Sequence, residues 1–154
     1  MRQDGGLRLT IRRRLPQFHW TSVESGSSQS GIPDLHGVLD GASLWIECKQ
    51  TDGWAVRFEQ FQVPWLTSYA RHGGTCWVAV RRRHAGGPRR GGAVDELWLV
   101  AGCHADVLAR DGLRGVSTAT VQEGGAALWD WPGIARLLCG GQRRRDAVRV
   151  APGR

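Results

Sequence analysis

Apolar positions along the first half of the chain change their spacing several times, and each change predicts a different element. Between Leu7 and Leu15, apolar residues recur every four positions among arginines, which predicts an amphipathic helix. Residues 18–23 are expected to be extended, and the serine- and glycine-rich residues 25–31 predict a loop. The chain therefore begins with a short helix whose polar face is basic.

The next segment predicts a β-hairpin followed by a helix. Leu35 to Leu39 and Ser43 to Lys49 are strand-like runs, separated by Asp40-Gly41, a dipeptide that tolerates the positive φ of a tight turn. From Phe58 to Tyr69, apolar side chains recur at helical spacing, and Gly73-Gly74 ends the predicted helix.

The second half of the chain predicts two buried strands around a basic loop. The strands are expected over residues 75–80 and 96–101, which are rich in β-branched and aromatic residues. Residues 81–92 between them are expected to be irregular, because they cannot bury enough apolar surface to order themselves. Short helices are expected over residues 105–109 and 131–138, and a frayed basic tail over residues 142–154.

Length and composition narrow the class of protein. A chain of 154 residues can build one full hydrophobic core, so we expect a single domain over residues 1–140 followed by a flexible basic tail over residues 141–154. The expected fold is α/β, with a mixed β-sheet flanked by helices. The apolar runs are far shorter than the roughly 20 residues that cross a bilayer. We therefore expect a soluble, cytoplasmic protein with no membrane partner.

The charge of the chain favours a polyanionic partner. The formal net charge is +7, and cations that neutralise phosphates release condensed counterions. Charge alone identifies no function, because arginine-rich composition also arises without such a partner. The arginines that we expect to contact DNA phosphates lie in the first helix and in the basic loop: Arg8, Arg12, Arg13, Arg81, Arg82, Arg83, Arg89 and Arg90.

The predicted hairpin carries the residues with the clearest chemistry. Side chains alternate along a strand, so Glu47 and Lys49 point to one face and Cys48 to the other. A turn at Asp40-Gly41 brings Asp34, at the start of the first strand, back beside Glu47. The pattern therefore predicts two converging carboxylates with a lysine beside them.

These groups suit divalent-metal chemistry on a phosphodiester. The carboxylates of Asp34 and Glu47, with the backbone carbonyl of Cys48, make a hard-oxygen site for Mg²⁺, with Mn²⁺ as an alternative. Lys49 is the only lysine among 21 basic residues, and a compact ammonium suits water positioning and charge neutralisation better than a guanidinium does. The competing interpretation is that Glu47 and Lys49 form an ordinary exposed ion pair.

The motifs resemble those of a known superfamily. Gly31-Ile32-Pro33-Asp34, then Trp45-Ile46-Glu47-Cys48-Lys49, then residues 57–66 and Gly73-Gly74, resemble the PD-(D/E)XK nucleases. The likeness is to the phage-borne virus-type replication-repair (VRR-NUC) and Holliday junction resolvase-like groups, and it covers about residues 23–80. It implies a restriction-endonuclease-like core, a phage or prophage origin and a homodimer.

The resemblance also implies further site residues. Family members often have an upstream acid that completes the metal site, and Glu24 stands where it is expected. They also tend to carry a glutamine at the start of the following helix, which is Gln60 or Gln62 here. Gln62 is preferred because it lies three residues before Trp65, which is the spacing associated with the family. Cys48 departs from the family pattern, in which a larger aliphatic residue usually lies between the glutamate and the lysine.

Together these observations predict a Mg²⁺-dependent nuclease that hydrolyses DNA phosphodiester bonds, as a structure-selective endonuclease for branched or junction DNA. Two other classes stay open: a non-catalytic nucleic-acid-binding protein that retains the nuclease fold, and a basic phage structural or assembly protein. The sequence leaves open the true substrate, endo- versus exonucleolytic cutting, and the number of metal ions.

Overall fold

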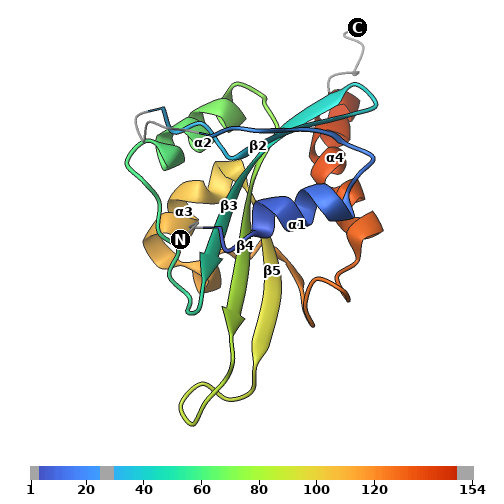
Figure 1. The fold of residues 1–154 in the computed structure, drawn as a ribbon. Coiled ribbons are helices and arrows are strands. Elements are labelled where there is room, and N and C mark those ends of the chain that lie inside the picture. Colours follow the sequence, from blue (N-terminus) through green and yellow to red (C-terminus); the bar gives the residue numbers. More distant parts are fainter. Residues whose placement is uncertain (1–3, 25–29, 149–154) are drawn as a thin grey trace, which may run out of the picture.

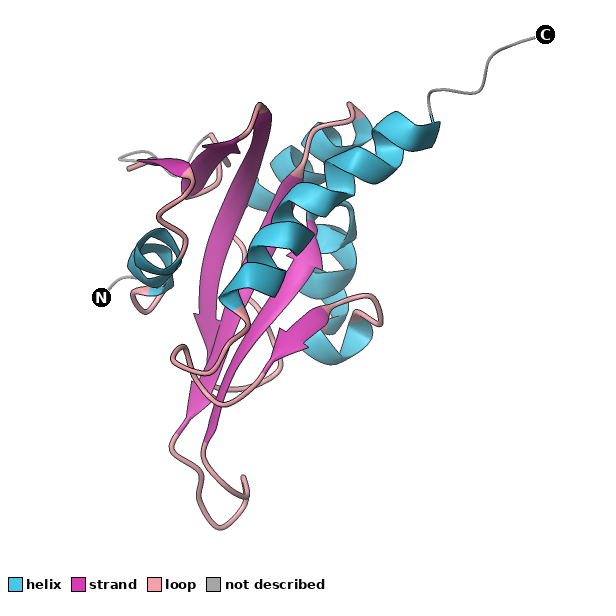
Figure 2. Ribbon diagram, turned by 90° about the vertical axis from the view of Figure 1, so that its right-hand side faces the viewer, coloured by secondary structure: helices cyan, strands magenta, loops and turns pink. Residues whose placement is uncertain are grey.

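The computed structural model of the chain describes residues 4–24 and 30–148, with side chains as far as residue 140. One six-stranded sheet, in the order β1-β2-β3-β4-β5-β6, has helices on both of its faces (Figures 1 and 2). The expected α/β fold with a mixed sheet flanked by helices is confirmed, and it is consistent with a restriction-endonuclease-like core.

The sheet is mixed because a single pair of its strands is parallel. β3 and β4 run parallel, whereas the other four neighbouring pairs are antiparallel. The chain crosses from β3 to β4 through α2, Gln62–Arg71. The strands are β1 His19–Ser22, β2 Leu35–Leu39, β3 Ala42–Thr51, β4 Cys76–His84, β5 Val94–Ala101 and β6 Thr120–Gln122.

Two apolar layers hold the helices to the sheet. α1, Leu7–Arg14, and α4, Trp131–Val148, pack on one face, where Cys48 is buried among their apolar residues. α2 and α3, Ala105–Asp111, pack on the other face. Because β3 alternates its side chains, Cys48 lies in the first layer while its neighbours at 47 and 49 face α2. Cys48 is 2% exposed, so this small side chain fits the core as expected.

The β2–β3 hairpin has the predicted register. Leu35 pairs with Ile46, and the turn at Asp40-Gly41 has φ of 49° and 79° at its two residues. The following helix starts later than expected, at Gln62 rather than near residue 58. This start places Pro64 in the first turn, where its missing N–H costs no helical hydrogen bond.

The expectation of an irregular loop over residues 81–92 is wrong for its first part. Arg81–His84 form the end of β4 and pair with the start of β5, and residues 85–93 form the tip of a projecting hairpin (Figure 1). Backbone ladder bonds and cross-strand ion pairs order this segment. The ion pairs are Arg81–Asp95, at 2.7 Å, and Arg82–Glu96, at 3.2 Å.

The C-terminal part of the fold also differs from the expectation. α4 runs well beyond residue 138, to Val148, so the first part of the predicted tail is helical. The short strand β6 was not predicted. Residues 149–154 and most of the predicted 25–31 loop lie outside the described residues. In the described part of the chain, no helix is long and apolar enough to cross a membrane.

Candidate active site

The hairpin brings the predicted acids together where the start of β2 meets the inner strand β3. Asp34 immediately precedes β2, and the antiparallel register places it opposite Glu47. The Asp34 Oδ2 atom accepts a hydrogen bond from the backbone N–H of Cys48 at 2.9 Å. On the α2 side of β3, the Lys49 ammonium lies 3.0 Å from Glu47 Oε1. The predicted convergence of Asp34, Glu47 and Lys49 is therefore present.

Gln62, at the start of α2, ties the glutamate to the lysine. Its Nε2 group donates to Glu47 Oε1 at 2.7 Å, and its Oε1 atom accepts from Lys49 Nζ at 2.7 Å and from the Glu59 backbone N–H at 2.9 Å. These three bonds fix the orientation of the amide. Of the two glutamines left open, the structure brings Gln62 to the site, whereas Gln60 is exposed.

Burial gives this polar network unusual electrostatics. Glu47 is 2% exposed and Lys49 is 4% exposed, so this is not the surface ion pair of the competing interpretation. The pKa of Glu47 is raised to about 7, mainly by desolvation and also by the charge of Asp34, and Lys49 opposes this rise. Desolvation also raises the pKa of Asp34, opposed by its bond from the Cys48 N–H. Two carboxylates that repel each other in a poorly solvated site favour a cation between them.

The donor atoms fit a hard divalent cation. Among the described residues, neither Asp34 Oδ1 nor Glu47 Oε2 makes a hydrogen bond. The N–H of Cys48 points toward Asp34, and the C=O of the same residue in a strand points to the same side. Two carboxylates and one carbonyl, completed by water and phosphate, are the ligands that Mg²⁺ prefers. No three His, Cys, Asp or Glu side chains in the described part of the chain gather into a further metal site.

The structure does not bring Glu24 into this group. Glu24 is exposed, and in the described part of the chain it makes no hydrogen bond or ion pair. It lines a cavity of about 210 Å³ with Arg8, Arg12 and Ser22. Its neighbour Val23 donates its N–H to the Asp34 carbonyl, so Glu24 borders the site through the backbone. A role for Glu24 at the metal stays a prediction.

Asp4 is an acid near the site that the sequence reasoning missed. It is 6% exposed, and its carboxylate accepts hydrogen bonds from the backbone N–H groups of Gly6 and Arg8 at the start of α1. Its charge raises the pKa of Asp34, whereas the charge of Arg8 lowers it. An aspartate just before an amphipathic run is an N-terminal capping pattern, which is the signal that could have identified it.

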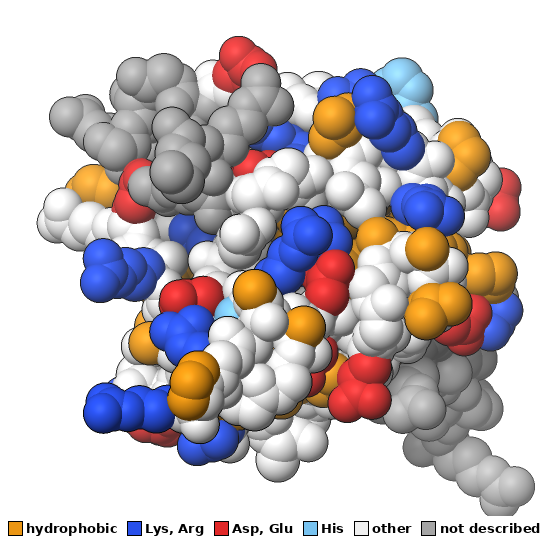
Figure 3. Space-filling model, turned by 60° about the horizontal axis from the view of Figure 1, so that its bottom comes forward, with side chains coloured by type: hydrophobic (Ala, Val, Ile, Leu, Met, Phe, Trp, Pro, Cys, Tyr) orange, Lys and Arg blue, Asp and Glu red, His pale blue; other side chains and the backbone are white. Residues whose placement is uncertain are grey.

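The arginines predicted to contact phosphates fall into two sets. Those with side-chain partners are Arg8, Arg12, Arg81, Arg82, Arg83 and Arg90, and Arg82 is buried. Within the described residues, Arg13 and Arg89 have no such partner, and both are exposed, as are Arg12, Arg83 and Arg90. On the face shown in Figure 3, basic side chains lie in several places with acidic ones between them. Contacts to phosphates are therefore expected from the exposed arginines, with Arg82 serving the structure of β4.

One family is found by comparison with known proteins. The family model described as archaeal Holliday junction resolvase (Hjc) matches residues 13–91, which is 79 of the 154 residues. The matched range includes Asp34, Glu47, Lys49 and Gln62, whereas Asp4 and Arg8 precede it. A search of curated proteins finds no match.

Proposed function

Because the chain belongs to the archaeal Holliday junction resolvase (Hjc) family, a nuclease family, we propose that it is a Mg²⁺-dependent endonuclease that cuts branched DNA. The observation that supports this proposal best is the buried contact network of Glu47, Lys49 and Gln62, next to the Asp34 carboxylate. Placing two carboxylates that repel each other in a poorly solvated site is unfavourable for folding. A binding protein without activity would have no need of this arrangement.

Each residue has a distinct proposed role. Asp34, Glu47 and the Cys48 carbonyl would hold the divalent ion. When bound, the ion would lower the pKa of a water and stabilise charge on the scissile phosphate. Gln62 and Glu47 hold the Lys49 ammonium at the carboxylates, where it adds positive charge beside the phosphate oxygens. Gln62 is a positioning residue, because its amide makes three hydrogen bonds to its protein neighbours.

The charge distribution supports recognition of DNA by its backbone. Residues 141–154 contain five arginines and one aspartate, so they contribute +4 to the formal net charge of +7. Phosphate contacts carry little sequence information, so selection of branched DNA by shape is favoured over base readout. A symmetric junction requires paired cuts, which supports a homodimer as part of the proposal. A phage or prophage origin stays a prediction from the sequence resemblance.

Cleavage of defined substrates tests the proposal. The wild-type protein is expected to cut a four-way junction in Mg²⁺ at least tenfold faster than a linear duplex of the same sequence, and to cut neither in EDTA. Gel analysis of end-labelled linear, flap and four-way DNA gives the rates and the cut positions. Tight junction binding without any cleavage in Mg²⁺ or Mn²⁺ would instead identify a non-catalytic binding protein.

Metal binding is expected to weaken as the pH falls through about 7. The raised pKa of Glu47 means that its carboxyl group keeps a proton below that pH, and the metal must displace it. In the metal-free protein the same shift lowers stability as the pH rises from the ordinary value of 4.5 to about 7, and a bound cation offsets this loss. From pH 8 to pH 6, the affinity should fall about tenfold, which lowers the metal-induced rise in Tm by about 3–5 °C.

Thermal unfolding with and without saturating Mg²⁺ at the two pH values measures this effect. The Glu47→Gln variant provides the control, because its side chain cannot titrate, and its smaller metal shift should not depend on pH. An equal metal-induced shift at pH 6 and pH 8 in the wild-type protein would contradict the proposed role of Glu47.

A further inference from the structure

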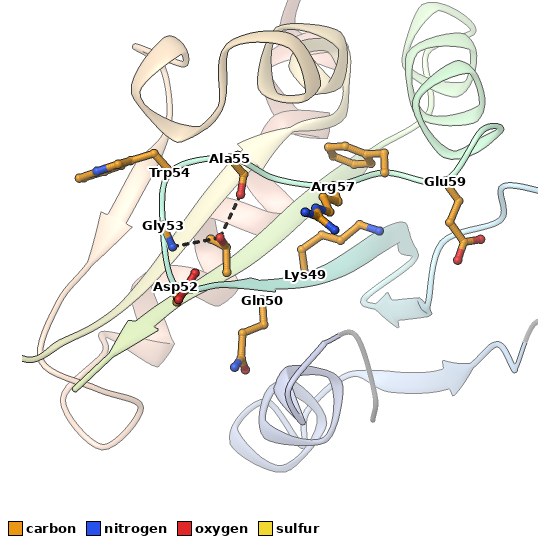
Figure 4. Close-up of a pocket in the computed structure, with 10 residues that line it drawn as sticks. Lys49, Gln50, Asp52, Gly53, Trp54, Ala55, Arg57 and Glu59 are labelled. Atoms are coloured by element: carbon orange, nitrogen blue, oxygen red, sulfur yellow. Dashed lines mark hydrogen bonds between the residues drawn. The ribbon is translucent and has the colours of Figure 1, made fainter. Parts of the chain in front are cut away.

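A cavity of about 630 Å³ opens beside Lys49, and neither Asp34 nor Glu47 is among the residues that line it. Its wall is the chain segment that leaves β3 and returns to α2, residues 49–59 (Figure 4). Lys49 forms part of both the catalytic network and the cavity lining. A strand whose phosphate lies at Lys49 therefore has this space directly beside it.

The cavity lining combines the chemistries that a nucleotide requires. Arg57 is exposed and supplies a cation for a phosphate, in addition to Lys49. Ala55 and Phe58 add apolar surface for a base or a sugar. Two acids also line the cavity. Asp52 forms an ion pair with Arg90 at 3.0 Å, and Glu59 lies close enough to Glu47 for its charge to raise the pKa of Glu47.

The wall of the cavity is held in place by contacts with other parts of the fold. The guanidinium carbons of Arg82 and Arg114 lie 3.8 and 4.0 Å from the ring centroid of Trp54, and the Trp54 carbonyl accepts a hydrogen bond from Leu113 at 2.8 Å. Thr51 Oγ1 donates to the Ala55 carbonyl at 2.9 Å. Such a preformed space would lose little conformational entropy when it takes a ligand.

The cavity has the size of a nucleotide and is too small to enclose paired DNA. A sphere of this volume is about 11 Å across, whereas the major groove of B-DNA alone is about 12 Å wide, so the cavity cannot enclose a duplex. A single nucleotide fits the usual range of ligand pockets, about 300 to 1,000 Å³. Nucleotides that can leave the stack at low cost are found at branch points and mismatches.

We propose that this cavity binds an unpaired nucleotide of the cut strand, next to the scissile phosphate. The inference rests on the proposed nuclease function and gives it a source of selectivity: strands that cannot release a nucleotide into the cavity are cut slowly. Arg57 contacts the phosphate of that nucleotide, and the space around Ala55 and Phe58 receives its base.

Filling the cavity tests the proposal. Ala55 and Ala109 are both exposed alanines, and Ala109 lies on α3, outside the cavity lining. Ala55→Phe is expected to lower the rate of junction cleavage at least tenfold with Tm unchanged within 2 °C, whereas Ala109→Phe, the matched control, should cut like the wild type. Arg57→Gln should weaken junction binding about threefold or more.

A binding measurement separates this proposal from the nuclease function. Junctions carrying 2-aminopurine at successive positions around the cut site are titrated with wild-type protein in EDTA, where cleavage is absent. Fluorescence should rise at one or two adjacent positions, and Ala55→Phe should abolish the rise.

The outcomes are distinguishable. The cavity proposal is overturned if Ala55→Phe cleaves as fast as Ala109→Phe and the wild type, or if 2-aminopurine fluorescence rises at no particular position with the wild type. Either result leaves the nuclease function intact. A rise that Ala55→Phe removes, in a protein that cleaves no DNA in Mg²⁺, supports the cavity as a nucleotide site and overturns the nuclease function.

Discussion

Glu47→Gln is expected to lower junction cleavage by about 10³-fold or more, while junction affinity changes less than about threefold. A thousandfold loss corresponds to about 4 kcal/mol of lost transition-state stabilisation, the scale expected when a metal ligand is removed. The amide has the same size as the carboxylate, and it can still contact Gln62 and Lys49, so the fold should persist. Single-turnover cleavage in Mg²⁺ and equilibrium binding in EDTA measure the two effects separately.

Substitutions at two other carboxylates provide comparisons for Glu47→Gln. Glu123→Gln changes an exposed acid remote in sequence from the hairpin and should retain wild-type cleavage. Glu24→Gln tests the upstream acid implied by the family resemblance, and a loss as large as that of Glu47→Gln would assign Glu24 to the metal site. Wild-type activity of Glu47→Gln would exclude the proposed site altogether.

Lys49→Arg is expected to lower cleavage by about 10²-fold or more, nearly as much as Lys49→Ala. Position 49 is 4% exposed, and its ammonium is held by Glu47 Oε1 and Gln62 Oε1 at 3.0 and 2.7 Å. A guanidinium keeps the charge but is larger and planar, so it cannot occupy the same point between these oxygens. The chain uses arginine at its 20 other basic positions, which makes the lysine here informative.

The reverse exchange on the surface is the matched control. Arg110, on α3, has a side chain that is 68% exposed and is not among the arginines expected to contact DNA, so Arg110→Lys should change cleavage less than about twofold. Rates measured over a range of pH in Mg²⁺ distinguish a lost ammonium from a disturbed fold, because a merely misfolded fraction lowers the rate equally at every pH. If Lys49→Arg cuts as fast as the wild type, any cation suffices at this position, and the argument from the lone lysine is wrong.

Local sequence determined the hairpin and the convergence at its base. Strand side chains repeat every two residues, and the turn at Asp40-Gly41 sets the register. These two facts place Asp34 beside Glu47 and put Lys49 on the same face as the glutamate. No distant part of the chain is needed for this inference, which is why it could be made before the fold was known.

Only the tertiary structure decided which other residues meet this hairpin. Whether Gln60 or Gln62 reaches Glu47 depends on where α2 begins and how it packs on the sheet. The nearness of Asp4 to Asp34 depends on where α1 sits on the opposite face of the sheet. Helical periodicity indicates which face of a helix is buried but not where the helix lies along its axis, because packing against segments distant in the sequence sets that position.

The ordering of the basic segment also came from distant residues. Composition alone predicted an irregular loop, yet Arg81 and Arg82 are held by Asp95 and Glu96 on the neighbouring strand. Short-range sequence thus determined the residue types of the proposed site and the common face of Glu47 and Lys49. Burial, which raises the pKa of Glu47, and the cavity beside Lys49 arise only when helices and strands remote in sequence enclose that face and remove its water.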